Sequence, residues 1–178
     1  MRLFRRRKKL NRWPSETSKC RRRLAPFCAG YGVDLGFGGD PITRHAIRMD
    51  MPRPYTDVGH AAVQLGGDAT DLHWFQDGVL DFIYSSHLLE DFPDTEEILR
   101  EWLRCLKPGG RLVLYCPDEQ AFRKHCDASG QPRNPHHSHD HFSLQQVKEV
   151  LDRIGPYRVL HELPLVDIYS WDLVVEKQ

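Results

Sequence analysis

The chain has 178 residues, of which 40% are hydrophobic and 28% charged, a composition typical of one globular domain rather than of a disordered chain. No apolar run approaches the roughly 18 residues that a membrane-spanning helix needs, which excludes an integral membrane protein of that kind. The five cysteines are odd in number, scattered and never in a C-x-x-C pair, which favours reduced thiols in a cytoplasmic protein.

The net charge of zero is the sum of a positively charged N-terminal segment and a negatively charged remainder. Residues 1–23 contain eleven Lys or Arg and one acid, whereas the remainder contains 14 basic and 24 acidic residues. We expect residues 1–14 to form a flexible basic arm and residues 15–178 a single domain. Three interpretations of the arm stay open: a solvated extension, a contact of residues 2–12 with an anionic membrane surface or RNA, and a nuclear or organellar address. The oligomeric state is left open.

After a short predicted helix over 16–28, which Pro26 interrupts, strand and helix patterns alternate, as they do in α/β folds with a mostly parallel sheet. The segments predicted as strands are, in chain order, 31–35, 45–49, 61–65, 79–84, 111–116, 157–163 and 170–176. The last two are expected to pair as an antiparallel unit. Because most of these segments are apolar throughout, we expect helices to cover both faces of the sheet.

Two further helices have clear start and stop patterns. The first is predicted over 95–107 after the N-cap Asp94, and the second over 144–154 after the N-cap Ser143. Each has an acid or amide at the capping-box position and a glycine shortly after its end. Apolar side chains recur along one side of each helix at helical spacing, so we expect that side to pack on the sheet.

Acids and glycines follow three successive predicted strands, at the edge where open α/β sheets bind ligands. The first strand runs into Gly36 and Gly38, whose backbone allows close approach and whose N–H groups can hold an anion. Asp50 ends the second strand, where a carboxylate suits ribose hydroxyls. Asp68 and Ala69 follow the third strand, where an acid can accept from an exocyclic amine such as that of adenine. Acids after successive strands indicate a ligand site rather than ordinary loop residues.

Taken together, these residues resemble the class I S-adenosylmethionine-dependent methyltransferases, above all their compact, small-substrate, type 11-like branch. The resemblance covers residues 30–118 closely. It rests on five stretches: Asp-x-Gly-x-Gly-Gly from Asp34 to Gly39, Asp50, Gly-Asp-Ala at 67–69, residues 80–92, and Leu-Lys-Pro-Gly-Gly-Arg-Leu at 106–112. It implies a Rossmann-like, seven-stranded, mostly parallel sheet with an antiparallel last strand, and S-adenosylmethionine as the cofactor.

The resemblance also implies roles for single residues. The cofactor-binding residues that it implies are Asp34, Gly36, Gly38, Asp50, Asp68, Ala69, Ser85 and Ser86. The two glycines would face the methionine part of the cofactor, the acid after the second strand the ribose, and the residues after the third strand the adenine. His87, just past the fourth predicted strand, is the first candidate for the general base that takes a proton from a hydroxyl or amine acceptor.

Two features depart from the family pattern. Asp40 stands where the family has its third motif glycine, and an acid near the cofactor's carboxylate is unfavourable unless it points away. The connection between the first two predicted strands, residues 36–44, is too short for the usual helix. Both features favour one alternative function, a methyltransferase-like module that binds a partner without catalysis.

Histidines gather in the segment after the fifth predicted strand, residues 117–142, which we expect to be a long loop. They are His125, His136, His137, His139 and His141. The one pair four residues apart, His137 and His141, lies in an expected loop rather than on a helix, and no C-x-x-C partner is present, so the sequence predicts no metal ligand. Three interpretations stay open: a metal site, a loop without a metal, and a lid over the acceptor in which one histidine is a base.

The function that the sequence favours is methyl transfer to a small molecule or a glycan precursor. The alternatives are the silent module, methylation of RNA or protein with help from the basic arm, and a nicotinamide-dependent oxidoreductase. The stretch 106–112 and the final hairpin argue against the oxidoreductase. Five aromatic side chains are candidates either for the acceptor pocket or for the core: Trp74, Phe75, Phe92, Phe122 and Trp171.

Overall fold

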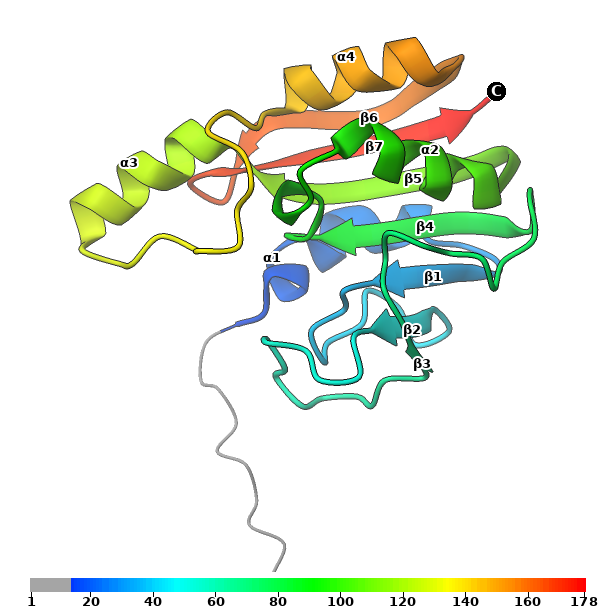
Figure 1. Cartoon of the computed structure of the whole chain (residues 1–178), viewed down its shortest axis with the longest axis horizontal. Helices are drawn as coiled ribbons and strands as arrows, with labels where there is room; N and C mark the ends of the chain where they lie inside the picture. The colour runs from blue at the N-terminus through cyan, green and yellow to red at the C-terminus, as the bar shows by residue number, and fades with distance from the viewer. Residues whose placement is uncertain (1–13) are drawn as a thin grey trace, which may run out of the picture.

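The computed structural model describes residues 14–178, and the contacts expected of residues 2–12 therefore lie outside the described residues. One sheet has the strand order β3-β2-β1-β4-β5-β7-β6, seen in Figure 1 from bottom to top. The strands are β1 Gly32–Leu35, β2 Ile47–Asp50, β3 Leu65–Gly66, β4 Leu80–Ser86, β5 Leu106–Pro117, β6 Tyr157–Val166 and β7 Ser170–Lys177. Within residues 14–178, β7 pairs antiparallel with both β5 and β6 while the other strand pairs are parallel, which confirms the predicted mostly parallel sheet with an antiparallel last strand.

Helices cover both faces of the sheet, as expected. They are α1 Glu16–Leu24, α2 Thr95–Cys105, α3 Glu119–Ser129 and α4 Leu144–Ile154, with short 3-10 turns η1 Ala25–Phe27 and η2 Leu89–Asp91. The face under α1 has one buried cluster, which includes Leu24, and the face under α2 and α4 has another, which includes Trp102 and Leu151. No helix within residues 14–178 is long and apolar enough to cross a membrane.

The central strand β4 shows why both faces need a layer of helices. Its side chains alternate between the two clusters: Ile83 packs under α2 and α4, whereas Phe82 and Tyr84 pack under α1. All three side chains are fully buried. A strand that is apolar on both faces is stable only when both faces are covered, which is the pattern that its sequence predicts.

Three segments differ from their prediction. The fifth strand was expected over 111–116 but begins at Leu106, directly after α2 ends at Cys105. The third strand was expected over 61–65, but only Leu65–Gly66 pairs with β2, because the Ala61 N–H donates to the Gly39 carbonyl at 2.9 Å instead. The expected loop over 117–142 is wrong in its first half, which forms α3. The Asp118 side chain caps that helix, accepting from the Ala121 N–H at 2.9 Å.

An ion pair between α1 and β7 holds this helix on the face of the sheet opposite α2 and α4. The Arg23 guanidinium donates from Nε to Oδ2 of Asp172 at 2.7 Å, and from a terminal nitrogen to Asp167 at 2.6 Å. The Asp172 side chain is fully buried in β7, and His161 lies 3.2 Å from the same oxygen. Because α1 begins at the edge of the sheet where β1 and β4 end, this pair also positions the first residues of α1 beside the candidate site.

We expect Arg23→Met to lower the free energy of unfolding by about 3 kcal/mol, because it leaves the carboxylate of Asp172 buried without its main partner. Urea unfolding followed by circular dichroism measures the change. Arg22→Met, on the exposed side of α1, is the matched control and should unfold like the unmodified chain. Equal midpoints for the two variants would show that this ion pair does not hold the helix.

Candidate functional site

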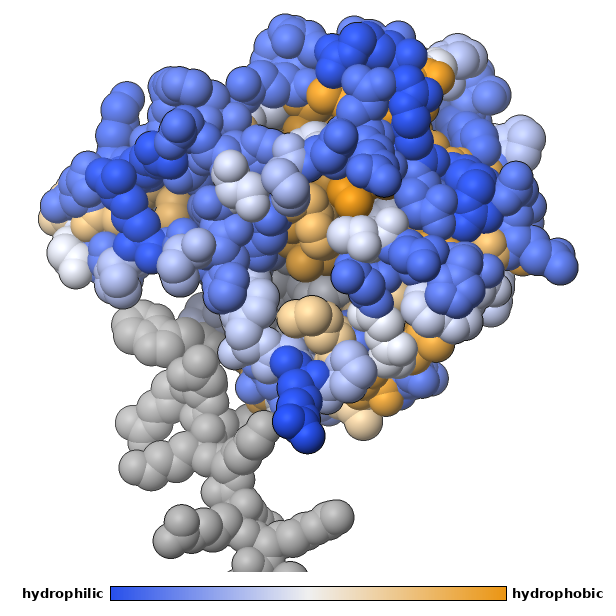
Figure 2. Space-filling model, viewed as in Figure 1, coloured by the Kyte–Doolittle hydropathy of each residue, from blue (hydrophilic) through white to orange (hydrophobic). Residues whose placement is uncertain are grey.

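Two cavities, of about 310 and 230 Å³, meet beyond the carboxyl ends of β1, β2 and β4. They share four lining residues, Gly36, Asp50, Tyr55 and Leu88. The larger cavity continues towards α1, α3 and the β6–β7 turn, and the smaller one towards residues 67–69. The face drawn in Figure 2 is mostly hydrophilic, with apolar side chains gathered near its centre. Strand order reverses between β1 and β4, which is where open α/β sheets bind ligands.

Most residues predicted to bind the cofactor line these cavities. Those that do are Gly36, Gly38, Asp50, Asp68, Ala69 and Ser86. Two do not, within the described part of the chain: Asp34 and Ser85 are fully buried inside β1 and β4, and the Ser85 hydroxyl lies 3.4 Å from the Leu35 carbonyl. A direct contact of these two side chains with the cofactor stays a prediction.

The turn after β1 requires glycine at its first position. Gly36 has a φ of 63°, a left-handed backbone conformation that other residues rarely adopt. A Cβ at this position would lie 2.8 Å from a methyl group of Leu88, so a side chain would also collide with the segment that follows β4. The Gly36 N–H donates to the Met49 carbonyl at 2.9 Å, which draws the turn towards the end of β2.

Asp50 lies at the junction of the two cavities. Its carboxylate accepts from the Gly38 N–H at 3.0 Å and from the Met51 N–H at 2.8 Å. Burial raises the pKa of Asp50 above its ordinary value, and the two N–H groups partly offset that effect. A partly buried carboxylate at the mouth of a largely apolar cavity suits hydroxyl donors such as those of ribose, so the residues present fit the cofactor that the sequence predicts.

Asp40, which departs from the family's glycine pattern, points away from both cavities. Its carboxylate accepts from the Ser15 hydroxyl and, at 2.5 Å, from the Arg21 guanidinium, and His60 lies 3.5 Å away. Burial alone would raise the pKa of Asp40, but Arg21 and Ser15 bring the pKa below its ordinary value. The acid therefore ties the turn after β1 to α1, and it lines neither cavity.

His87 lines the larger cavity in a constrained conformation. Its φ is 49°, and its N–H donates to the Tyr115 carbonyl at 2.8 Å, so the backbone is fixed between β4 and β5. The ring nitrogen Nε2 lies 3.1 Å from the Ser170 hydroxyl and 3.4 Å from the Glu16 carboxylate. Burial lowers the pKa of His87 to about 4, so the imidazole is neutral at neutral pH.

The five aromatic candidates divide between the cavities, the core and the surface. Phe122 lines the larger cavity and Phe92 the smaller one. Phe75 and Trp171 are buried in the core, whereas Trp74 is 47% exposed.

A buried acid–histidine cluster beside the larger cavity was not predicted from the sequence. Its members are Glu90, Glu119 and His137, whose side chains are 1%, 3% and 5% exposed. His137 Nδ1 lies 2.6 Å from a Glu119 oxygen, and the Arg123 guanidinium donates to the other oxygen at 2.6 Å. The sequence signal was the placement of an acid inside the apolar run Leu-Leu-Glu-Asp-Phe, an unfavourable position unless the fold supplies a partner.

Comparison with known proteins identifies methyltransferases among the relatives of this chain. A family model described as a methyltransferase domain matches residues 22–114. A Mycolicibacterium smegmatis protein named "Probable S-adenosylmethionine-dependent methyltransferase" is 24% identical over 163 residues, which cover 82% of this chain and 59% of that protein. The ubiquinone/menaquinone biosynthesis C-methyltransferase UbiE of Vibrio vulnificus is 29% identical over 101 residues, covering 46% and 39%. The chain thus spans less than two thirds of these curated relatives.

Solved structures agree on the fold. The chain superposes on an S-adenosylmethionine-dependent methyltransferase from Thermotoga maritima with a TM-score of 0.66 and 19% identity, covering 92% of this chain and 88% of the other. An identity this low supports the architecture and leaves the chemistry to the residues of the site.

Asp34 has an unusual environment for an acid in the middle of a strand. Its side chain is fully buried, Oδ2 accepts from the Ile42 N–H at 2.6 Å, and Oδ1 has no hydrogen-bond partner among the described residues. Burial raises the pKa of Asp34 well above its ordinary value. At pH values between the pKa of Asp34 in the unfolded chain and its raised pKa in the folded chain, the Asp34 carboxyl group is protonated when the chain is folded and ionised when it is unfolded.

The stability of the chain should therefore fall as pH rises through that range, by up to about 1.4 kcal/mol per pH unit from Asp34 alone. Asp34→Asn holds no such proton, so its unfolding free energy should lose this slope in the pH range above the unfolded pKa of an aspartate. Urea unfolding at constant ionic strength measures both slopes, with Asp127→Asn on the exposed side of α3 as the control. Identical slopes for Asp34→Asn and the unmodified chain would contradict the prediction.

Proposed function

The chain belongs to the methyltransferase-domain family, whose cofactor is S-adenosylmethionine, and we propose that it transfers a methyl group to a small-molecule acceptor or a glycan precursor. The observation that carries the proposal is the pair of cavities that meet at Gly36 and Asp50. One suits the adenosine part of the cofactor, and the other has room for its methionine part and for an acceptor. No added recognition domain lies within residues 14–178, which favours a small acceptor.

In this proposal Asp50 holds the ribose hydroxyls, and Asp68 and Ala69 contact adenine in the smaller cavity. The turn at Gly36 and Gly38 lies against the larger cavity, where the methionine part belongs. When bound, the cofactor supplies a sulfonium methyl group that needs no further activation. The protein's own task is to align the acceptor with that methyl group and to exclude water.

His87 is the proposed general base for a hydroxyl or amine acceptor. Its position supports this role, because its side chain lines the larger cavity close to the junction residue Leu88. Contacts with Ser170 and Glu16 hold the imidazole ring in place. A held ring at the cavity wall costs little further ordering when the acceptor binds.

Two other functions remain as outcomes of the tests. The silent module would show cofactor binding without turnover, or no binding at all. Methylation of RNA or protein would depend on residues 2–12, which the structure does not describe. The proposed location is the cytoplasm, supported by five unpaired cysteines, all of them buried.

Calorimetric titration of the full chain with S-adenosylmethionine and S-adenosylhomocysteine should give saturable binding of one molecule of each. Asp50→Asn should weaken the binding at least about tenfold, because it removes a charged hydrogen-bond acceptor for the ribose. Asp127→Asn, at an exposed acid that lines neither cavity, should bind like the unmodified chain. A folded chain that gives no heat with either ligand would contradict the proposed cofactor site.

His87→Gln should lower kcat by about 100-fold or more with a hydroxyl or amine acceptor, because proton transfer then lacks its base. Release of S-adenosylhomocysteine from a panel of small hydroxyl, amine and glycan-precursor acceptors measures the rate. The affinity for S-adenosylhomocysteine should change less than the rate does. His141→Gln, an exposed histidine of the same sequence segment, is the control. A variant His87→Gln that keeps the original rate would assign the base elsewhere.

A further inference from the structure

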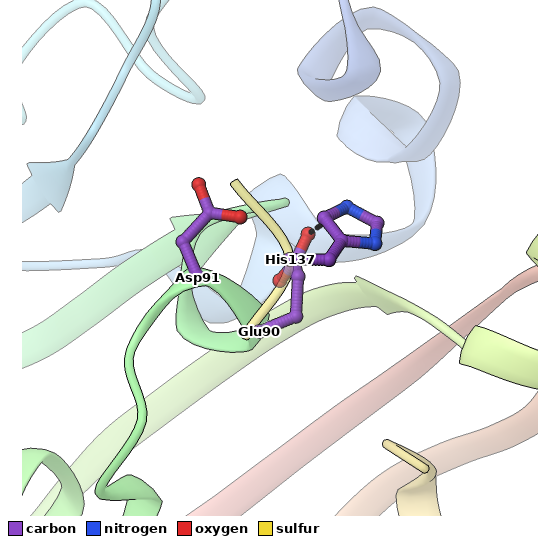
Figure 3. Close-up of side chains that lie close together, drawn as sticks. All are labelled: Glu90, Asp91 and His137. Atoms are coloured by element: carbon purple, nitrogen blue, oxygen red, sulfur yellow. Dashed lines mark ion pairs between the residues drawn. The ribbon is translucent and has the colours of Figure 1, made fainter. Parts of the chain in front are cut away.

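The strongest unassigned feature is a group of three side chains at the wall between the two cavities. Glu90 and Asp91 belong to η2, directly after β4, and His137 belongs to the segment between α3 and α4. One ligand atom from each of the three lies within 4.8 Å of the others. Figure 3 shows Glu90 between Asp91 and the imidazole ring of His137. Asp91 lines the smaller cavity and His137 the larger one.

Backbone contacts fix this arrangement before any ligand binds. The Ser138 N–H donates to the Glu90 carbonyl at 3.0 Å, and the Ser138 hydroxyl donates to the Asp91 carbonyl at 2.5 Å. The segment that carries His137 is therefore held directly on η2. A preformed group of donors costs less ordering on binding than one assembled from mobile loops.

Glu90 is buried without the partners that a carboxylate needs. Its side chain is 1% exposed, and neither carboxylate oxygen has a hydrogen-bond partner among the described residues. Two imidazole nitrogens, Nε2 of His137 and Nδ1 of His87, each lie 3.8 Å from Oε1, which is too far for a hydrogen bond. Oδ1 of Asp91 is likewise buried without a partner, although its other oxygen accepts from the Tyr55 hydroxyl at 2.8 Å. Native structures leave few such groups without a partner, and a cation supplies one.

His137 is oriented as metal-binding histidines are. Its Nδ1 lies 2.6 Å from the Glu119 carboxylate, which Arg123 holds from the other side. A carboxylate at this distance keeps the proton on Nδ1, so the lone pair of Nε2 faces Glu90. A carboxylate that accepts from one ring nitrogen leaves the other nitrogen free to bind a metal ion, and this arrangement fixes the tautomer of a histidine ligand.

We propose that Glu90, Asp91 and His137 bind one divalent first-row transition-metal ion, with zinc as the ion to test. One imidazole nitrogen with two carboxylate oxygens is a donor set that zinc accepts, whereas magnesium and calcium prefer oxygen alone. Ligands about 2.0–2.2 Å from one ion lie about 3–3.5 Å from each other. The 3.8 Å between Nε2 of His137 and Oε1 of Glu90 is close to that spacing, and all three ligand atoms lie within 4.8 Å of one another, so binding an ion requires the side chains to move closer together.

An ion at this wall would have a direct use, which rests on the proposed function. Three protein ligands leave a coordination position for water or for an oxygen atom of the acceptor. An acceptor hydroxyl bound there would lose its proton more readily, because the ion stabilises the alkoxide. The substrate class that this predicts is a small molecule with a hydroxyl or carboxylate oxygen near the methylated atom.

The test uses the full chain, stripped with a chelator and dialysed, and titrated with zinc chloride in a calorimeter. The expected result is one ion per chain, together with a rise in the midpoint of thermal unfolding, because the ion binds the folded state. Glu90→Gln and His137→Gln should each weaken zinc binding at least about tenfold and abolish the thermal shift. Glu97→Gln and His141→Gln make the same substitutions at exposed positions and should bind zinc like the unmodified chain.

Absence of saturable zinc binding in the unmodified chain overturns the proposal, and so does equal binding by Glu90→Gln. Loss of binding in His141→Gln would also overturn it, since the ligands would then lie on the exposed histidines. If Glu90→Gln does not fold, Asp91→Asn and His137→Gln decide in its place. S-adenosylhomocysteine is titrated into the same stripped samples, so failure of the ion site is distinguished from failure of the cofactor site.

Discussion

The candidate site depends on the close approach between the turn after β1 and the segment after β4. β1 and β4 are parallel neighbours, with Leu35 opposite Ser85, so their next residues leave the sheet side by side. Gly36 fits against Leu88 only because it has no side chain, since a Cβ would lie 2.8 Å from a Leu88 methyl group. These two residues line both cavities. The contact therefore divides the crevice into two parts and fixes where they meet.

Segments from both ends of the chain complete that crevice. The Arg23–Asp172 ion pair joins α1 to β7, and the first turn of α1 then brings Glu16 to 3.4 Å from the His87 ring. Asp40 adds a second tie, because it binds Arg21 of the same helix. The first residues of the domain, which carry no recognisable motif, are thus part of the cavity wall. Uncharged contacts add to these ties, because the Tyr84 hydroxyl of β4 donates to the Thr17 hydroxyl at 3.2 Å and lies 3.1 Å from the Cys20 sulfur.

Local patterns in the sequence predicted the elements whose signals lie in a few consecutive residues. The strand ends, the glycine turn and Asp50 belong to this group, because turn residues after an apolar run have few alternative structures. α3 was missed because its sequence is mostly polar, with only Glu119 and Cys126 buried. Successive side chains of a strand point to opposite faces of the sheet. What each face contacts depends on the neighbouring strands and helices, so the sequence of one strand does not reveal whether an acid such as Asp34 faces a cavity or the core. The Glu90–His137 contact joins distant segments, and only the packed fold brings them together.

Three acids at this edge of the sheet share one electrostatic property, a pKa raised by burial. Asp50, Glu90 and Asp91 all have raised pKa values, and burial is the main cause in each case. Carboxyl groups taken out of water become less costly when a positive charge lies beside them. A cationic cofactor in the cavities and a metal ion at Glu90 would each supply that charge. This edge of the sheet therefore suits cationic ligands better than neutral ligands of the same shape.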